Sequence, residues 1–492
     1  MLQEGKRVNS IDAVIIANCG KDRLLRRTNA NKVKNRGSGT RREIDVIKMR
    51  MLKLMHFVVC IAFFVLLWFK FRYHGQILFN HPGFRYNYYV IAIYALMLLF
   101  FFRTYNAYML GYSRIRELIF SQVTSQVFSA IAIYIAVSIA WNRFDSPLAF
   151  IVLIAVQVAV DIIWGILANM YYFKLNPPKK TILIYRNEKD RRRFGTLAGK
   201  NGEKLYKVKK ELEYDGDFDD LKEIIGGYEA IFVAGLNSRC RNGILKYCKE
   251  TGTPGFFIPH VGDIIMQGAH HIQAFDAPLL LVEKKSVNLE FTIIKRAFDI
   301  ISSLLGIIIL SPLLLVTALA IKIYDGGPAI YRQTRLTKGG REFMICKFRS
   351  MRVDAEKDGI ARLSTGDDDD RITPVGKFIR KCRIDELPQL WNILKGDMSV
   401  VGPRPERPEI AEQYYDVMPD FKFRLQVKAG LTGYAQIYGK YNTDPYEKLE
   451  FDLMYINDMS VLTDLSLMFA TFRILFISDS TEGIDSDKTN AM

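Results

Sequence analysis

Four long apolar blocks follow one another in the first part of the chain and constrain its fold more than any other feature. They cover 51–69, 86–102, 118–141 and 148–173. Each is close to or above the roughly 17 residues that an α-helix needs to cross a bilayer. Tyr and Trp lie toward several block ends, as in the aromatic belts of membrane helices. We therefore predict four transmembrane helices, forming a bundle within 51–175, rather than buried helices of a soluble protein.

Basic residues on both sides of these blocks predict the orientation. Residues 1–50 are basic and polar, and Lys174, Lys179 and Lys180 follow the fourth block. Because an even number of spans returns the chain to its starting side, both ends are expected to face the cytoplasm. We expect 1–50 to form a disordered cytoplasmic arm, and the polar tail, 477–492, to be disordered too.

The composition excludes several classes of protein. A chain of 492 residues that is 49% hydrophobic is neither a disordered nor a collagen-like chain, nor a small disulfide scaffold. Its net charge of +16 favours an anionic membrane face or an anionic substrate. No aromatic interleaving supports nucleic-acid binding, so no nucleic-acid partner is expected. The six cysteines form no CxxC pair or metal-binding quartet, which predicts reduced thiols.

Residues 178–283 have the pattern of a soluble α/β domain. Apolar strands are expected at 181–185, 228–235 and 254–260, with helical segments between them. This alternation predicts a small parallel, Rossmann-like sheet. The turn after the first strand lacks the GxGxxG fingerprint, so a dinucleotide site is not expected. A regulatory or assembly domain is the prediction.

A further apolar segment at about 300–323 contains Ser311-Pro312 near its middle. Proline removes a backbone donor and clashes with the preceding turn, so the helix should bend there. The alternatives are a fifth full span and a re-entrant helix with both ends on one face. Basic residues on both sides favour the re-entrant helix, with Ser311 as a candidate partner for a freed carbonyl.

The densest chemistry is in 371–410, where Asp385 and Glu386 are adjacent. Arg380 precedes this pair and Arg404 follows it. Carboxylates beside guanidinium groups suggest a site for a metal–phosphate substrate, because Mg²⁺ prefers carboxylates with substrate phosphates and arginine binds phosphate bidentately. A carboxylate can also act as a nucleophile on phosphorus. By itself, however, an Asp-Glu pair is more often a solvated helix end.

Motifs spread over the last 200 residues resemble the bacterial sugar transferase family, which comprises phosphoglycosyl transferases. They include KRAFDI at 295–300, GGPAIYRQTRLTKGG at 326–340 and KFRSM at 347–351. RITPVGKFIRKCRIDELPQLWNILKGDMSVVGPRPE follows at 371–406, and VKAGLTGYAQIYGK at 427–440. The whole chain is similar to the polytopic branch that initiates exopolysaccharide synthesis. A mainly helical catalytic domain over 290–476 is implied.

The resemblance implies transfer of a sugar-1-phosphate from a UDP-sugar to undecaprenyl phosphate, with release of UMP. Asp385 would be the nucleophile and Glu386 the Mg²⁺ ligand. The implied phosphate-binding residues are Arg380 and Arg404, the latter in a turn that begins at Pro403. Lys347 and Arg349 are weaker candidates for the same anionic site. The implied location is the bacterial inner membrane, with the catalytic domain in the cytoplasm.

The sequence departs from the family pattern at two positions. Ala429 replaces a proline, which would loosen its turn, and Lys440 replaces an arginine, which loses a bidentate fork. Asp367–Asp370 resembles a metal-binding run but is expected to be a solvated loop.

Two other functions remain open. One is a plain glycosyltransferase that releases UDP, and the other a non-catalytic scaffold or regulator of polysaccharide export. A homodimer formed through the membrane spans or the central domain also remains open, because no residue in the sequence requires it.

Overall fold

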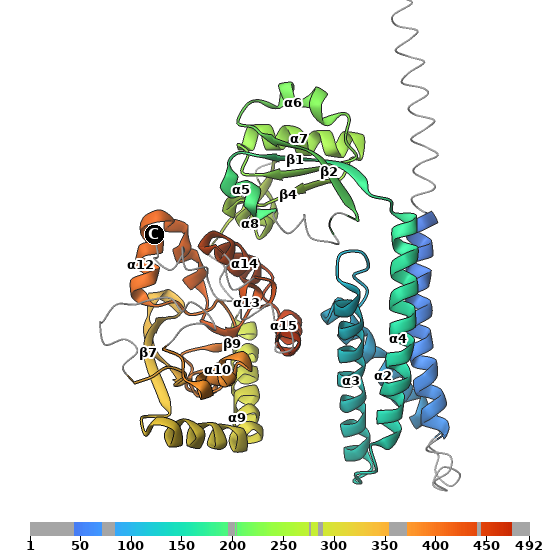
Figure 1. Cartoon of the computed structure of the whole chain (residues 1–492), viewed down its shortest axis with the longest axis vertical. Coiled ribbons are helices and arrows are strands. Elements are labelled where there is room, and N and C mark those ends of the chain that lie inside the picture. Colours follow the sequence, from blue (N-terminus) through green and yellow to red (C-terminus); the bar gives the residue numbers. More distant parts are fainter. Residues whose placement is uncertain are drawn as a thin grey trace, which may run out of the picture. The chain divides into compact units, whose positions relative to one another are not determined.

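The computed structural model describes residues 44–70, 84–194, 202, 204–274, 277–283, 289–353, 371–439 and 444–474 (Figure 1). Residues 1–43 of the expected arm, the Asp367–Asp370 run, Lys440 and the expected disordered tail lie outside them. The chain divides into two compact units. One holds Met1–Phe100, Tyr108–Pro178 and Lys200–Leu205, and the other Phe101–Ala107, Lys179–Gly199 and Tyr206–Met492. Each unit is described by itself.

All four apolar blocks are helical. The helices are Ile44–Lys70, α2 (Phe84–Thr104), α3 (Ile115–Ala140) and α4 (Leu148–Leu175). The first begins at Ile44, so residues 44–50 belong to this helix and not to the predicted disordered arm. The helix is longer than its apolar block, because basic residues before the block can also be helical, with their long aliphatic stems lying along the apolar surface.

The polarity of these helices is inverted relative to that of a soluble protein. Leu66, Ile139 and Ile163 are each more than 60% exposed, whereas Gln126 and Asp161 are fully buried. With α9 (Leu289–Asp325), the described residues contain five helices that are long and apolar enough to cross a membrane. This arrangement is that of a membrane protein.

The predicted α/β region contains a four-stranded parallel sheet. Its strands are β1 (Lys179–Tyr185), β2 (Tyr206–Glu213), β3 (Ala230–Ala234) and β4 (Gly255–Phe257), in the order β2-β1-β3-β4. The charged strand β2 has no apolar run, which is why the sequence pattern missed it. Helices α5 (Glu188–Arg193), α6 (Phe218–Ile225) and α7 (Ser238–Thr251) complete the region, with α6 and α7 packed on Ile182, Ile184 and Ile231.

The segment after this sheet joins the C-terminal core. It comprises α8 (Val261–Gln267) and the hairpin β5 (His270–Ala274) with β6 (Ala277–Leu281). Val261 and Ile264 of α8 are buried in the same cluster as Ile393 and Leu449. The Asn457 amide also donates to the Ile264 carbonyl oxygen at 2.6 Å. The α/β region and the C-terminal region therefore share a packed boundary.

Helix α9 has Pro312 inside it and changes direction sharply partway along (Figure 1). Pro312 has no N–H to donate to the carbonyl of Ile308, four residues earlier. The Ser311 hydroxyl donates to that carbonyl oxygen instead, at 2.8 Å. The Ser-Pro pair thus introduces a bend and supplies a hydrogen bond to the carbonyl that the proline deprives of its partner.

The C-terminal region combines short strands and helices around one core. The antiparallel pair β7 (Ile330–Leu336) and β8 (Glu342–Phe348) lies beside a two-stranded parallel pair, β9 (Ser399–Val401) and β10 (Gly430–Thr432). The described residues of this region include the 3₁₀ helices η1 (Lys338–Gly340), η2 (Ile384–Glu386) and η3 (Pro419–Gln426). The α-helices are α10 (Pro374–Lys381), α11 (Gln389–Lys395), α12 (Pro408–Val417), α13 (Tyr434–Tyr438), α14 (Pro445–Asn457) and α15 (Val461–Ile474).

Charged residues in the first half of α9 anchor this helix to the C-terminal core. Arg296 donates to the carbonyl oxygens of Ile393 and Leu394 at the end of α11, both at 2.7 Å. The buried Asp299 carboxylate accepts from the Ser399 hydroxyl at 3.0 Å and the Val400 N–H at 2.9 Å. Strand β9 is therefore held directly by α9.

We predict that Asp299→Ala lowers the stability of the protein by roughly 2–4 kcal/mol, because it leaves two buried donors without an acceptor. The measurement is thermal unfolding in detergent, followed by circular dichroism. Asp416→Ala, on an exposed position of α12, is the matched control and should leave the melting temperature nearly unchanged. Equal melting temperatures for the two variants would contradict the role of Asp299.

Candidate functional site

The Asp385–Glu386 pair lies on η2, directly after α10. Thr373 caps α10 by accepting from the Gly376 N–H at 2.9 Å, and Pro374 occupies the first turn. A Cβ on Gly376 would lie 1.9 Å from the Ser350 carbonyl oxygen. Only glycine therefore allows α10 to approach the end of β8 this closely, which brings η2 near Lys347.

Arg383 turns the chain between α10 and η2. It has φ 54° and ψ 23°, in the left-handed region that non-glycine residues seldom adopt. Such strained positions persist where the surrounding structure holds them, and they cluster at functional sites. Here the strained residue comes two positions before Asp385.

Glu386 connects three segments of the site through its carboxylate. Its Oε1 accepts from Lys347 Nζ of β8 at 3.2 Å and from Arg404 Nη2 at 2.8 Å. The Glu386 side chain is only 12% exposed. Burial favours the neutral form, but Arg404 and Lys347 outweigh it and hold the pKa of Glu386 well below its usual range. Glu386 is thus ionised.

Asp385 has the opposite electrostatic character. Burial, followed by the negative charge of Glu386, raises the pKa of Asp385 to about 6, against the opposing effect of Lys347, Arg380 and Arg404. Two adjacent carboxylates therefore have pKa values that are driven apart. This is a common electrostatic signature of functional sites.

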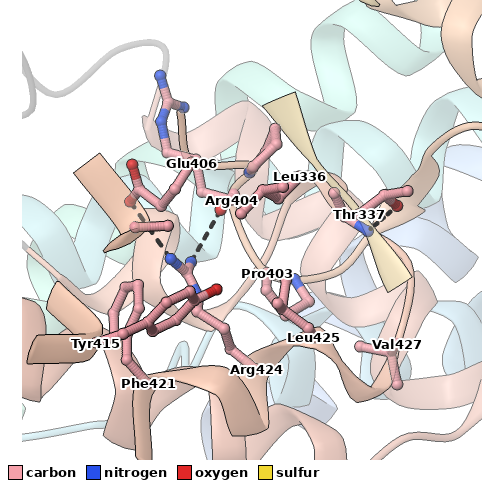
Figure 2. A pocket seen from close by; sticks show the side chains of 13 residues that line it. Leu336, Thr337, Pro403, Arg404, Glu406, Tyr415, Phe421, Arg424, Leu425 and Val427 are labelled. Atoms are coloured by element: carbon pink, nitrogen blue, oxygen red, sulfur yellow. Dashed lines mark hydrogen bonds and ion pairs between the residues drawn. The ribbon is translucent and has the colours of Figure 1, made fainter. Parts of the chain in front are cut away.

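The turn that carries Arg404 is held through its backbone carbonyls. Pro403 and Pro405 have no N–H, so the turn cannot be anchored by donors at these positions. Instead, four consecutive carbonyl oxygens accept hydrogen bonds from β10, η3 and β7, and the bond from Arg424 to the Arg404 carbonyl is drawn in Figure 2. The bonds are Gly430 N–H to Pro403 at 2.8 Å, Arg424 Nη2 to Arg404 at 2.8 Å, Arg335 Nη1 to Pro405 at 3.2 Å and Leu336 N–H to Glu406 at 3.0 Å.

Arg424 is the buried centre of this support. Its side chain is 3% exposed and forms ion pairs with Glu406 at 3.4 Å and Asp452 at 2.8 Å. Figure 2 shows it reaching from η3 toward the turn. Arg424 therefore positions Arg404.

Ala429, where the family pattern has proline, is buried in a well-anchored turn. Its N–H donates to Thr337 Oγ1 at 3.2 Å, and its carbonyl accepts from the Ser399 N–H at 2.8 Å. A proline could not make the first bond. The expected loosening at this position is therefore offset by a hydrogen bond that alanine makes possible.

The structure brings together Lys347, Asp385, Glu386 and Arg404, with Arg380 near enough to act on the Asp385 pKa. Arg349 packs against the segment just after α9, where a Cβ on Gly327 would be 2.0 Å from its Nη1. Sequence reasoning missed the supporting roles of Arg335 and Arg424. Arg335 is on a strand within a quoted motif, but nothing in the pattern indicated that it binds a backbone carbonyl.

The donor set fits a magnesium ion bound in part by substrate. Mg²⁺ is usually held by one or two carboxylates together with substrate phosphates. Asp385 and Glu386 supply such carboxylates, and Lys347, Arg380 and Arg404 supply cations for the phosphates. The arrangement suits a nucleophilic or metal-assisted reaction at phosphorus.

We predict that Arg424→Met destabilises the protein by roughly 3–5 kcal/mol, because it removes the buried cation that forms ion pairs with Glu406 and Asp452. Arg341→Met is the matched control, since Arg341 is 61% exposed and its partner Asp397 keeps a second ion pair, with Lys395 at 3.5 Å. Thermal unfolding of both variants provides the measurement. Similarly small losses of stability in the two variants would show that Arg424 does not support the turn that carries Arg404.

The relatives found by comparison with known proteins include the following three. A UDP-N-acetylgalactosamine-undecaprenyl-phosphate N-acetylgalactosaminephosphotransferase from Aeromonas hydrophila is 42% identical over 188 residues, 38% of this chain and 44% of the relative. A UDP-glucose:undecaprenyl-phosphate glucose-1-phosphate transferase from Klebsiella pneumoniae is 41% identical over 220 residues, 44% and 45% of the two chains. A protein of the same name from Caulobacter vibrioides is 40% identical over 191 residues, 38% of this chain and 71% of the relative.

The matched part spans less than half the length of the first two relatives. The model of the bacterial sugar transferase family matches residues 290–478, which include α9 and the whole site described above. Together with the coverage of the Caulobacter relative, this match establishes that the chain belongs to the bacterial sugar transferase family.

Proposed function

We propose that this protein transfers a sugar-1-phosphate from a UDP-sugar to undecaprenyl phosphate, releases UMP and forms the first lipid-linked intermediate of a polysaccharide. The observation that carries the proposal is the Asp385–Glu386 pair among Lys347, Arg380 and Arg404. Relatives are named for the transfer of a sugar phosphate to undecaprenyl phosphate, which supports it.

The first step is attack by the Asp385 carboxylate on the β-phosphorus of the UDP-sugar. A phosphorus–oxygen bond to Asp385 forms, the bond to the bridging oxygen of the α-phosphate breaks, and UMP leaves with that oxygen. In the second step a phosphate oxygen of undecaprenyl phosphate attacks the same phosphorus. The bond to Asp385 breaks, the carboxylate is regenerated, and the product is undecaprenyl diphosphate sugar.

The residues around Asp385 stabilise the negative charge of the substrate phosphates. Arg404 is 44% exposed, so its guanidinium can reach a substrate phosphate while its backbone stays fixed. Glu386 would hold Mg²⁺, which when bound would neutralise phosphate charge. Lys347 and Arg380 add positive charge beside Asp385.

The proposed membrane topology would bring the UDP-sugar and undecaprenyl phosphate together at one site. The proposed topology is a four-helix bundle and a re-entrant α9 in the bacterial inner membrane, with the catalytic region on the cytoplasmic face. Because α9 fastens to β9 through Asp299, the Arg404 turn after β9 is tied to a membrane helix. A site held at the membrane surface reduces the entropy lost when a lipid phosphate meets a cytosolic nucleotide.

We predict that the purified protein, given Mg²⁺, undecaprenyl phosphate and a panel of UDP-sugars, releases UMP. Asp385→Asn should lower the rate by more than about 1,000-fold, because it removes the nucleophile. Asp416→Asn, at an exposed position, is the matched control. Release of UDP, or full turnover by Asp385→Asn, would contradict the proposed reaction.

We also predict that UMP release in the first half-reaction falls as the pH drops through about 6, since Asp385 must be ionised to attack. The lipid acceptor is omitted because a phosphate monoester also titrates at a pKa near about 6. The amplitude and rate of the UMP burst are measured by rapid quench. A rate that stays constant between about pH 5 and about pH 7.5 would contradict this role of Asp385.

The re-entrant topology predicts that both ends of α9 face the cytoplasm. Single cysteines in place of Glu290 and Lys338, both exposed, test this in a variant without the six native cysteines. A membrane-impermeant thiol reagent should label both from the cytoplasmic side only, in inside-out vesicles. Labelling from opposite sides would establish a full span.

A further inference from the structure

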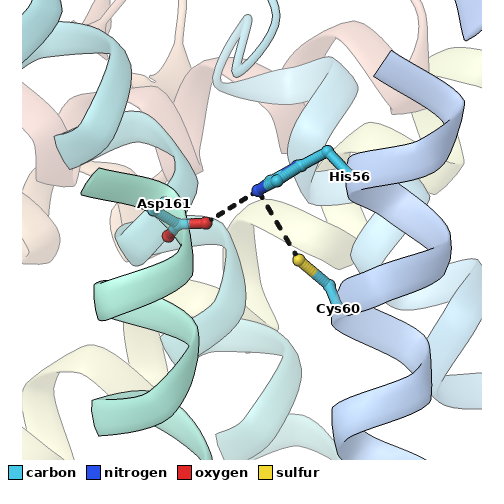
Figure 3. Close-up of side chains that lie close together, drawn as sticks. All are labelled: His56, Cys60 and Asp161. Atoms are coloured by element: carbon cyan, nitrogen blue, oxygen red, sulfur yellow. Dashed lines mark hydrogen bonds and ion pairs between the residues drawn. The ribbon is translucent and has the colours of Figure 1, made fainter. Parts of the chain in front are cut away.

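A second cluster of ligand-type side chains lies within the first unit, in a region outside the proposed catalytic site. His56 and Cys60 are four residues apart on the helix Ile44–Lys70, so they share one face. Both point toward Asp161 of α4 (Figure 3). His56 Nε2 lies 3.0 Å from Asp161 Oδ1 and 3.7 Å from Cys60 Sγ.

The three side chains are completely enclosed by protein. Cys60 and Asp161 are 0% exposed, and His56 is 1% exposed. Ionisable side chains inside membrane helices are costly, and they mark functional positions or pair with one another. The buried polar atoms of this cluster therefore require hydrogen-bond partners or a bound ion.

Hydrogen bonding within the described residues satisfies only part of the cluster. Asp161 Oδ1 accepts from Gln126 Nε2 at 3.0 Å, and the same amide lies 3.5 Å from Cys60 Sγ. Asp161 Oδ2 and Gln126 Oε1 are buried and have no hydrogen-bond partner among those residues. Both are acceptors, so the site has an excess of lone pairs, which a cation can satisfy.

The ligand atoms have the spacing that a small cation requires. One atom from each of His56, Cys60 and Asp161 lies within 4.8 Å of the other two. A tetrahedral zinc site with bonds of about 2.0–2.3 Å places its ligand atoms roughly 3.3–3.8 Å apart. The separations of 3.0 Å and 3.7 Å need only small side-chain adjustments to reach this geometry.

The surroundings also provide the outer hydrogen bonds of a metal site. A histidine ligand usually donates its second ring N–H to a neighbouring acceptor. His56 Nδ1 lies 3.0 Å from the Tyr108 hydroxyl, which can accept that proton and leave Nε2 available as a ligand. Gln126 similarly orients the Asp161 carboxylate.

We propose that His56, Cys60 and Asp161 bind one Zn²⁺ inside the helical unit. The charges favour a divalent, thiolate-binding ion: a Cys60 thiolate and an Asp161 carboxylate balance two positive charges, while His56 stays neutral. Electroneutrality matters because an unpaired charge is strongly disfavoured in a low-dielectric interior. Binding replaces the thiol proton of Cys60 with a metal–sulfur bond and releases that proton to solvent. The ion would fasten the helix Ile44–Lys70 to α4.

The test is metal binding by the full chain in detergent, with Zn²⁺ alone and then Co²⁺ as probes. Elemental analysis after removal of loose metal should give one zinc per chain. The cobalt form should show thiolate-to-cobalt charge-transfer absorption in the near ultraviolet. Zinc should also raise the melting temperature of metal-free protein.

Cys60→Ser should lose the bound zinc and the charge-transfer band. Cys240→Ser is the matched control, because Cys240 is also buried but lies on α7. If Cys60→Ser does not fold, Asp161→Asn should still show a loss of zinc with helix content retained. Wild-type protein that binds no zinc, a cobalt form without the thiolate band, or Cys60→Ser with full zinc content would overturn the proposal. Copper in place of zinc would overturn the identity of the ion.

Discussion

The ion pairs of Glu386 with Lys347 and Arg404 are the interaction on which the catalytic region depends. A buried carboxylate next to Asp385 would be strongly destabilising without these cations. With them, Glu386 remains charged, and its charge helps to keep the pKa of Asp385 high. The two partners come from β8 and from the turn after β9, so the site exists only when these segments are folded against η2.

The same turn links the site to α9, which is long and apolar enough to cross a membrane. Its carbonyls are held by Arg335, Arg424 and backbone donors, and the strand before it is held by Asp299 of α9. A displacement of α9 would therefore act on the strand that leads into Arg404. The sharp bend of α9 and the Ser311 hydrogen bond to Ile308 place that helix in a defined shape. The link from α9 to the turn that carries Arg404 is thus a short chain of direct contacts.

Sequence patterns predicted the features that depend on local order. The four apolar blocks, the strands at 181–185 and 228–235, and a bend in the helix that contains Pro312 follow from hydropathy, periodicity and proline chemistry. The convergence of Lys347 with Glu386 was reached only through resemblance, because 39 positions separate them in the chain. The support by Arg424, the shared core around Ile264 and the His56–Cys60–Asp161 cluster depend on long-range packing, for which no local pattern exists.

Mass spectrometry of the reaction intermediate is the measurement that tests the proposed covalent role of Asp385. Protein incubated with Mg²⁺ and its UDP-sugar, but without the lipid, is quenched in acid and digested with protease. If Asp385 is the nucleophile, the peptide that contains it gains the mass of one sugar phosphate, and undecaprenyl phosphate removes this mass when added before the quench. An unmodified peptide under conditions that release stoichiometric UMP, or a sugar phosphate on a different residue, would contradict the covalent role of Asp385.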